Sequence, residues 1–192
     1  AEHFKLAHQY YQLDLSSEPI CDIVKRFLGC GEGCVDHLSG YMDGFAICAA
    51  LMDSGVQGII RGDQAFGRNA ISGGALETRS TLVPLWSDFA NLPAPSHFGI
   101  PAQETPEALL WREGESVETW RDRLQQQFRV PVVVAALNDL KLPYVEIVSP
   151  LLSNSIVTEV RRLPDRLRTD KSLFKRIADD LTPNVRFARY PA

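Results

Sequence analysis

The chain has few cysteines, no long hydrophobic run and no strong excess of charge, and each absence excludes a class of protein. Four cysteines in 192 residues are too few for a disulfide scaffold. The longest apolar runs, Phe45–Met52 and Val130–Leu137, fall well short of the roughly 18–20 residues that span a bilayer. A formal net charge of −4 differs from the basic footprint of a nucleic-acid-binding protein. We therefore expect neither nucleic acid nor a membrane as a partner.

Several catalytic signatures are also missing. The sequence contains no GxSxG, GxxxxGK[ST] or HExxH pattern, so it gives no support to a serine hydrolase, a Walker-type NTPase or a zinc protease. Cys30 and Cys34 have a CxxxC spacing with only His37 as a nearby further ligand, and reduced thiols are favoured over a zinc site. The mixed, polar stretch Ala1–Gln9 does not resemble a signal peptide, so we expect a cytoplasmic protein.

The composition that remains is that of an ordinary globular domain, with 45% hydrophobic and 23% charged residues. The length predicts a single domain over residues 1–192. Within it we expect an α/β part over residues 1–68, a loop-rich part over 69–110 and a helical part over 111–192.

The α/β part is predicted from apolar spacing and from turn residues. The expected elements are the end of a helix at Glu2–Ala7, a strand at Gln9–Leu15, a helix from Pro19 to about Leu28, a helix over 38–53 with Gly55 as its C-cap, and a buried parallel strand at Val56–Ile60. A helix, a turn, a strand and a polar loop in this order are typical of a layered α/β fold, whose ligands bind beyond the carboxyl ends of the strands.

The second half of the chain is predicted to be mainly helical. The expected helices are a short one around Leu82–Phe89, one beginning at Thr105, Ser116–Phe128 with Ser116 as N-cap, Leu151–Leu163 before Pro164, and Lys171–Leu181 before Pro183. Val130–Leu140 fits a helix or a buried strand, and Pro143–Pro150 is expected to be extended or a turn.

Asp63 is the first candidate functional residue, because it lies in the glycine-containing loop Gly62–Gly67 directly after the expected strand. A carboxylate there can hold Mg²⁺ through one oxygen, and a glycine lets backbone approach a phosphate closely. The local pattern alone favours an Asx-turn or a helix cap instead.

Glu146 and Lys171 are two further candidates. Glu146 has apolar neighbours, so it fits either a general base in a buried site or a carboxylate that points to solvent from a strand. Lys171 comes at the start of a helix, where a cation becomes favourable if a polyphosphate binds at the same end. Ordinary surface chemistry, with Thr169 or Asp170 as the cap, is the simpler interpretation.

The order of these segments resembles the synthetase domain of the asparagine synthetase family, the ATP-pyrophosphatase (PP-loop) enzymes. VQGIIRGDQAFG, at Val56–Gly67, is similar to the family's VVLSGEGADELFGG, with Asp63, Phe66 and Gly67 on matching positions. Ala1–Leu15 resembles the stretch in which a helix leads to the family's second strand.

Two later segments extend the resemblance to about residue 182. EIVSPLLS, which begins at Glu146, is similar to ExRxPFLD and matches it at Glu146, Pro150 and Leu152. After a further helix and a Leu-Pro pair, RTDKSLFKRI places Lys171 on the lysine of the family's GxxKxLLR segment.

The resemblance implies a three-layer parallel sheet of the adenine nucleotide alpha-hydrolase type and an ATP-dependent amide-forming ligase. Such an enzyme adenylates a small-molecule or peptide carboxylate, and an amine, or ammonia from a glutaminase domain or subunit, then attacks. It implies ATP and Mg²⁺ as cofactors, with Gly62, Asp63 and Lys171 binding ATP and Asp63 holding the metal. Glu146 and Lys171 would be catalytic, as a base and as a charge that stabilises the leaving pyrophosphate.

The chain also departs from the family pattern. The SGGxDS loop that binds pyrophosphate is not found, Ser72-Gly73-Gly74 is out of place, and the glutamate of GEGAD has no clear counterpart. We therefore expect either a fragment of a ligase or a divergent chain that lost the loop. The alternative function is that of a degenerate, non-catalytic homologue that acts as a binding or scaffold subunit.

Overall fold

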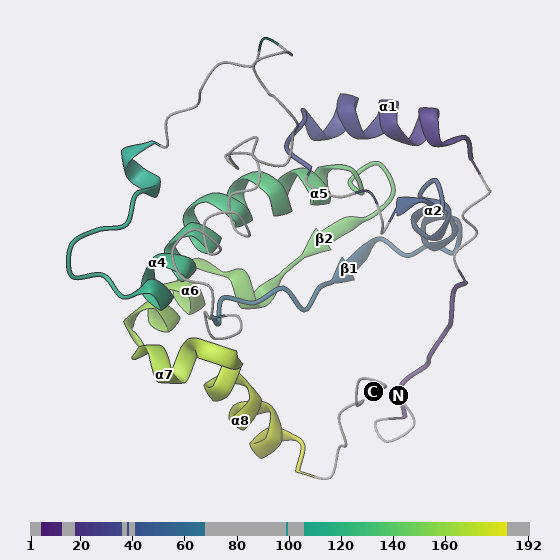
Figure 1. Ribbon diagram of the computed structural model, residues 1–192. Helices are drawn as coiled ribbons and strands as arrows, with labels where there is room; N and C mark the ends of the chain where they lie inside the picture. The colour runs from purple at the N-terminus through teal and green to yellow at the C-terminus, as the bar shows by residue number, and fades with distance from the viewer. Residues whose placement is uncertain are drawn as a thin grey trace, which may run out of the picture.

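The computed structural model describes residues 5–12, 18–35, 38, 41–67, 99 and 106–183. These residues mix helices with two short strands that pair in parallel, which gives the chain α/β character. One long helix runs alongside the strands, and the last helices gather near the strands' carboxyl ends (Figure 1). The resemblance implies a three-layer fold with a larger parallel sheet, whereas the described residues contain a sheet of two strands.

The helices account for most of the described elements. In chain order they are α1 Ile20–Gly31, α2 Ala46–Asp53, the 3₁₀ helix η6 Glu107–Leu109, α4 Val117–Leu124, the π-helix η7 Gln125–Val134, α5 Ala135–Asp139, the 3₁₀ helix η8 Pro150–Leu152, α6 Asn154–Arg162, α7 Asp165–Arg168, the 3₁₀ turn η9 Thr169–Lys171 and α8 Ser172–Leu181.

The sheet joins two segments that are far apart in the sequence. Strand β1 (Gly58–Ile60) pairs in parallel with β2 (Glu146–Val148), so that Gly58 lies opposite Glu146. The expected strand at 56–60 is therefore present, but it is not buried, because the Ile60 side chain is 79% exposed. The part over 111–192 that we expected to be helical contributes β2, from the segment expected to be extended or a turn.

A continuous helix from α4 through η7 to α5 packs along this sheet (Figure 1). Its start is the expected one, since the Ser116 hydroxyl accepts a hydrogen bond from the Thr119 amide at 3.1 Å. The segment Val130–Leu140, for which helix and strand were both open, is helical. Pro131 lies inside η7, where the wider π turn accommodates a residue that has no amide hydrogen to donate.

Helix α2 is shorter than the helix expected over 38–53. Residues 42–45 form turns, and Gly44 and Phe45 have left-handed φ angles of 66° and 64°. The Asp43 carboxylate accepts hydrogen bonds from the amides of Phe45 and Ile47, both at 3.2 Å, so this side chain starts the helix late.

The end of α2 follows the sequence signal. Gly55 has a φ of 80°, and its amide donates to the Met52 carbonyl at 2.9 Å. The next amide, from Val56, donates to the Leu51 carbonyl at 3.0 Å, which completes a Schellman motif. This turn directs the chain into β1.

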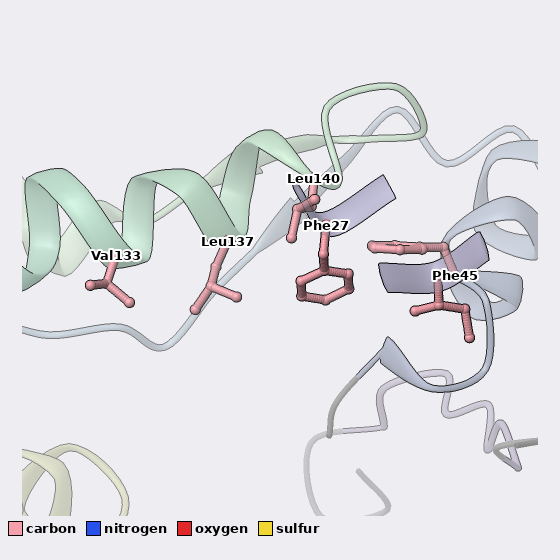
Figure 2. Close-up of a cluster of buried hydrophobic side chains, with 6 residues drawn as sticks. Phe27, Phe45, Val133, Leu137 and Leu140 are labelled. Carbon is pink, nitrogen blue, oxygen red and sulfur yellow. The ribbon is translucent and has the colours of Figure 1, made fainter. Parts of the chain in front are cut away.

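An apolar cluster holds α1 and the segment before α2 against the long helix. Figure 2 shows Phe27 and Phe45 beside Leu137 and Leu140. The buried residues of this cluster are Ile23, Phe27, Phe45, Val133, Leu137 and Leu140. A second cluster of Leu109, Trp120, Leu124 and Phe128 packs η6 onto α4.

Four other expected elements are not found in the described residues, lie outside them or are shorter than expected. Residues 6–12 have no regular structure, so neither the end of a helix at Glu2–Ala7 nor a strand at Gln9–Leu15 is found there, and the rest of both segments lies outside the described residues. The helix expected at Leu82–Phe89 also lies outside them. The helix expected from Thr105 is only the short η6.

Candidate functional site

A cavity of about 190 Å³ lies beyond the carboxyl end of β1. Its walls come from the loop after β1, the π-helix η7, the 3₁₀ helix η8 and the residue before α8. The lining residues are Gly62, Asp63, Gln64, Phe66, Gln125, Val130, Val134, Leu152 and Lys171. Three residues predicted to bind ATP, Gly62, Asp63 and Lys171, thus meet in one cavity.

The volume of this cavity limits what the described residues can enclose. Small-molecule pockets usually have volumes of roughly 300–1,000 Å³. At about 190 Å³, the space suits a phosphate group or another part of a ligand rather than a whole nucleotide.

The Asp63 carboxylate forms an ion pair with the guanidinium of Arg61. Arg61 approaches both of its carboxylate oxygens, at 3.2 and 3.4 Å, and the Ser149 hydroxyl donates to one of them at 3.5 Å. A further nitrogen of Arg61 donates to the Asn138 side-chain oxygen at 2.9 Å. The loop after β1 is thereby tied to α5 and to the end of β2.

Lys171 lies at the start of α8 in an unusual backbone conformation. Asp170 and Lys171 have left-handed φ angles of 55° and 57°, which cost energy in residues other than glycine. The ring of Phe174, one turn into α8, contacts the ring of Phe66, with centroids 5.4 Å apart. This contact fixes the start of α8 against the loop after β1 and places the lysine at the cavity.

Glu146 is the predicted site residue that the fold places elsewhere. It is the first residue of β2, lies opposite Gly58 and is exposed. Because Asp63 and Lys171 lie beyond the carboxyl end of the sheet, Glu146 is at the opposite end of its strand and does not line the cavity. The fold therefore brings Asp63 and Lys171 together and does not bring Glu146 to them. The exposed position of Glu146 fits the second of its two interpretations, a carboxylate that points to solvent from a strand.

A buried ionic cluster of Arg121, Asp122 and Arg168 lies against Gly67, the last described residue of the loop after β1. Asp122 accepts hydrogen bonds from both arginines, and Arg168 also contacts Asp165. Burial raises the pKa of the Asp122 carboxyl, while the hydrogen bond from Arg121 and the charge of Arg168 oppose that rise. The cluster joins α4 to α7. Its member in α7, Arg168, is three residues before Lys171.

Gly67 shows how closely the loop after β1 packs on this ionic cluster. A side chain at this position would collide with the guanidinium of Arg121 and lie 3.0 Å from the Arg168 carbonyl oxygen. Only glycine fits without a shift, which gives a physical reason for the residue at this point of the loop.

Lys141 is a buried cation beside the same loop. It is 8% exposed, its ammonium lies 5.1 Å from the centre of the Tyr41 ring, and its nitrogen has no hydrogen-bond partner among the described residues. Burial and the nearby Arg61 lower the pKa of Lys141 to about 8, against smaller opposing effects of Cys48 and Asp63. The sequence offered no signal for it, since lysines are usually exposed.

Metal chemistry has little support among the described residues. They contain no group of three or more histidine, cysteine, aspartate or glutamate side chains that suits a metal ion. Cys30 and Cys34 are free thiols, and His37 lies outside the described residues. No helix of the described part is long and apolar enough to cross a membrane.

Comparisons with protein-family models, with curated proteins and with solved structures find no match to this chain.

Proposed function

We propose that this chain is an ATP-binding domain of the asparagine synthetase type, belonging to an ATP-dependent ligase that forms amide bonds or to a fragment of one. The observation that supports this most directly is the meeting of Gly62, Asp63 and Lys171 at one cavity beyond a parallel strand. These residues come from two segments that resemble two separate motifs of that family. The fold brings the two segments together at the cavity, as it would in a member of that family.

The chemistry of the cavity suits a phosphate chain. The Lys171 ammonium supplies a positive charge, and the amino end of α8, a helix of 10 residues, adds the favourable end of the helix dipole. In a ligase of this type, Lys171 would stabilise the charge that develops on the departing pyrophosphate. The acyl substrate, the amine donor, a glutaminase partner and a cytoplasmic location stay predictions.

The predicted magnesium role of Asp63 fits the site poorly. Mg²⁺ is usually held by one or two carboxylates together with phosphate oxygens and water. Here the one available carboxylate already faces Arg61 with both oxygens. The proposal therefore assigns the neutralisation of phosphate charge to Lys171 and derives no step through a metal held by Asp63.

A second candidate function is that of a non-catalytic binding subunit. The exposed position of Glu146, away from the cavity, and the Arg61–Asp63 ion pair favour it. The ligase requires ATP binding and turnover, whereas a binding or scaffold subunit requires no turnover. ATP–pyrophosphate exchange in the presence of candidate carboxylates separates them, because a non-catalytic subunit gives no exchange.

Isothermal titration with ATP tests the ATP binding that the proposed ligase requires. Replacing Lys171 by methionine removes the charge and keeps the length of the side chain. We expect ATP to bind about 10- to 100-fold more weakly, in line with the loss of a charged hydrogen bond. Lys175→Met, an exposed lysine one turn further along α8, is the matched control and should bind like the original chain. Equal ATP affinity in both variants, or no ATP binding by the original chain, would contradict the proposal.

A further inference from the structure

A second cavity, of about 490 Å³, lies at η6 and the loop that follows it. It shares no lining residue with the cavity that contains Lys171. All of its lining residues are exposed, and two of them are large and apolar: Leu110 is 48% and Trp111 is 45% exposed. The remaining lining residues are Glu107, Ala108 and Arg112. Adjacent apolar side chains in a hollow of the surface, with charged groups beside them, are typical of an interaction site.

The backbone around Trp111 is fixed by a buried arginine. Arg123 is 4% exposed, and it donates hydrogen bonds to the carbonyl oxygens of Ala108 and Leu110. It also binds both carboxylate oxygens of Glu115, each at 2.8 Å, and these hydrogen bonds lower the pKa of that carboxyl. The segment on both sides of Trp111 is thus held in one shape before a partner binds, which reduces the entropy that binding costs.

The Trp111 ring is itself held in place and offers mainly apolar surface. It lies parallel to the ring of Trp120, with centroids 5.6 Å apart and an angle of 6° between the planes. Its indole N–H donates to the Glu115 carbonyl at 2.6 Å, so the only polar group of the ring already has a partner. A rigid tryptophan that stays nearly half exposed has the character of the anchor residues at the centres of protein interfaces.

One acid and one base stand at this apolar surface. Glu107 and Arg112 are both exposed, and neither side chain forms an ion pair or a hydrogen bond with another described residue. The charge of Arg112 helps to lower the pKa of the Glu115 carboxyl, but Glu115 is bound by Arg123. A surface with an apolar centre, one acid and one base is complementary to a second copy of itself. When two copies meet about a two-fold axis, each acid can face the base of the other copy.

We propose that this cavity is the centre of a dimer interface between two copies of the chain, in which Leu110 and Trp111 pack against the same residues of the second copy. Glu107 of each copy then faces Arg112 of the other. The charges favour this two-fold arrangement, because a parallel one would bring like charges together. A lining of five residues makes the interface small, so we expect a weak dimer with a dissociation constant on the order of 10–100 µM. The inference goes beyond the proposed function and does not depend on it.

Sedimentation equilibrium of the chain, up to about 500 µM and therefore above the expected dissociation constant, tests whether it dimerises. Trp111→Ala should weaken the dimer about 10- to 100-fold, as for an anchor residue at the centre of an interface. Tyr10→Ala, which removes an 82% exposed aromatic side chain outside the lining, is the matched control and should dimerise like the original chain. Urea denaturation checks that each variant is folded, because Trp111 also contacts Trp120.

A charge exchange tests the pairing without removing an apolar contact. Arg112→Glu places acids opposite acids, and Glu107→Arg places bases opposite bases, so each single variant should weaken the dimer about 10-fold or more. The double variant restores opposite charges and should dimerise within about 3-fold of the original chain. An equimolar mixture of the two single variants should associate as well, since each acid again meets a base. Glu113→Arg reverses a charge at an exposed residue outside the lining, and as the control it should have less effect than either single variant.

Three results would overturn this proposal. An original chain that stays monomeric at the highest concentration would show that no second copy binds at the cavity. A dimer that Trp111→Ala leaves unchanged would form through a different surface. Single charge variants whose association neither the double variant nor the mixture restores would refute the pairing of Glu107 with Arg112 of the second copy.

Discussion

The apolar cluster around Phe45 and the ionic cluster around Asp122 connect different parts of the molecule through different kinds of interaction. The first packs α1 and the start of α2 against the long helix through buried aliphatic and aromatic groups. The second joins α4 to α7 through buried arginine–carboxylate contacts. An apolar cluster tolerates substitutions that conserve its volume, whereas loss of one partner of a buried ion pair leaves a buried charge without its counter-charge. The ionic cluster includes Arg168, three residues before Lys171, which lines the cavity.

Removing the central carboxylate should have the largest effect. Asp122→Asn keeps the shape and removes the buried negative charge that Arg121 and Arg168 both contact. We expect a loss of about 3–5 kcal/mol in the free energy of unfolding, measured by urea denaturation. ATP affinity should also fall, because α7 leads directly to Lys171. The exposed pair Arg162–Glu159 supplies the control, since Glu159→Gln should cost at most about 1 kcal/mol. Similar costs for the two variants would refute the special role of the buried cluster.

Truncation in the apolar cluster should reduce stability and leave the cavity intact. Leu137→Ala removes a buried side chain from the long helix and leaves a space beside Phe27. The expected cost is about 2–5 kcal/mol in the free energy of unfolding. ATP affinity, measured by titration on the folded protein, should fall less than in Asp122→Asn, because Leu137 is not among the described residues that line the cavity. A large loss of affinity would mean that the two clusters are coupled.

Lys141 is a third case, a buried charge that forms no ion pair with another described residue. Its pKa of about 8 in the folded chain is below the ordinary 10.5, so the unfolded chain binds the proton more tightly. Its contribution therefore destabilises the folded chain below pH 8 and fades as the pH rises from about 8 to 10.5. Lys141→Met should stabilise the chain by about 1–3 kcal/mol at pH 7 and by less at pH 9.5.

The measurement for Lys141 is the difference between the two proteins in urea denaturation at each pH. Burial also raises the pKa values of Tyr41 and Cys48, which disfavours folding at high pH in both proteins. Taking the difference cancels most of that effect. A constant difference between pH 7 and pH 9.5 would show that Lys141 keeps an ordinary pKa in the folded chain.

Several local features of this fold could be predicted from short stretches of sequence. Ser116 starts α4, Gly55 ends α2, and a short strand follows, as their residue types indicate. Hydrogen bonds and backbone angles within about five residues decide such features. The late start of α2 was missed because the Asp43 side chain offers the backbone an alternative to the helix.

The candidate site could be predicted only in part. The motif resemblance brought Asp63 and Lys171 to attention, and the fold places them at one cavity. The same resemblance suggested Glu146, which the register of β2 puts at the other end of the strand. Gln125, which also lines the cavity, was not predicted, because nothing in three consecutive glutamines distinguishes one of them in the sequence.

The sequence by itself determined where several helices start and stop and which residues are chemically able to hold an anion, since those properties belong to single side chains and their nearest neighbours. Only the tertiary structure decided which of these residues meet. The pairing of β1 with β2, the contact of Asp122 with Arg168 and the meeting of Asp63 with Lys171 at the cavity all depend on contacts between segments distant in the chain. Such contacts form only when packing can offset the entropy of ordering the chain, and no local pattern of residues encodes that balance.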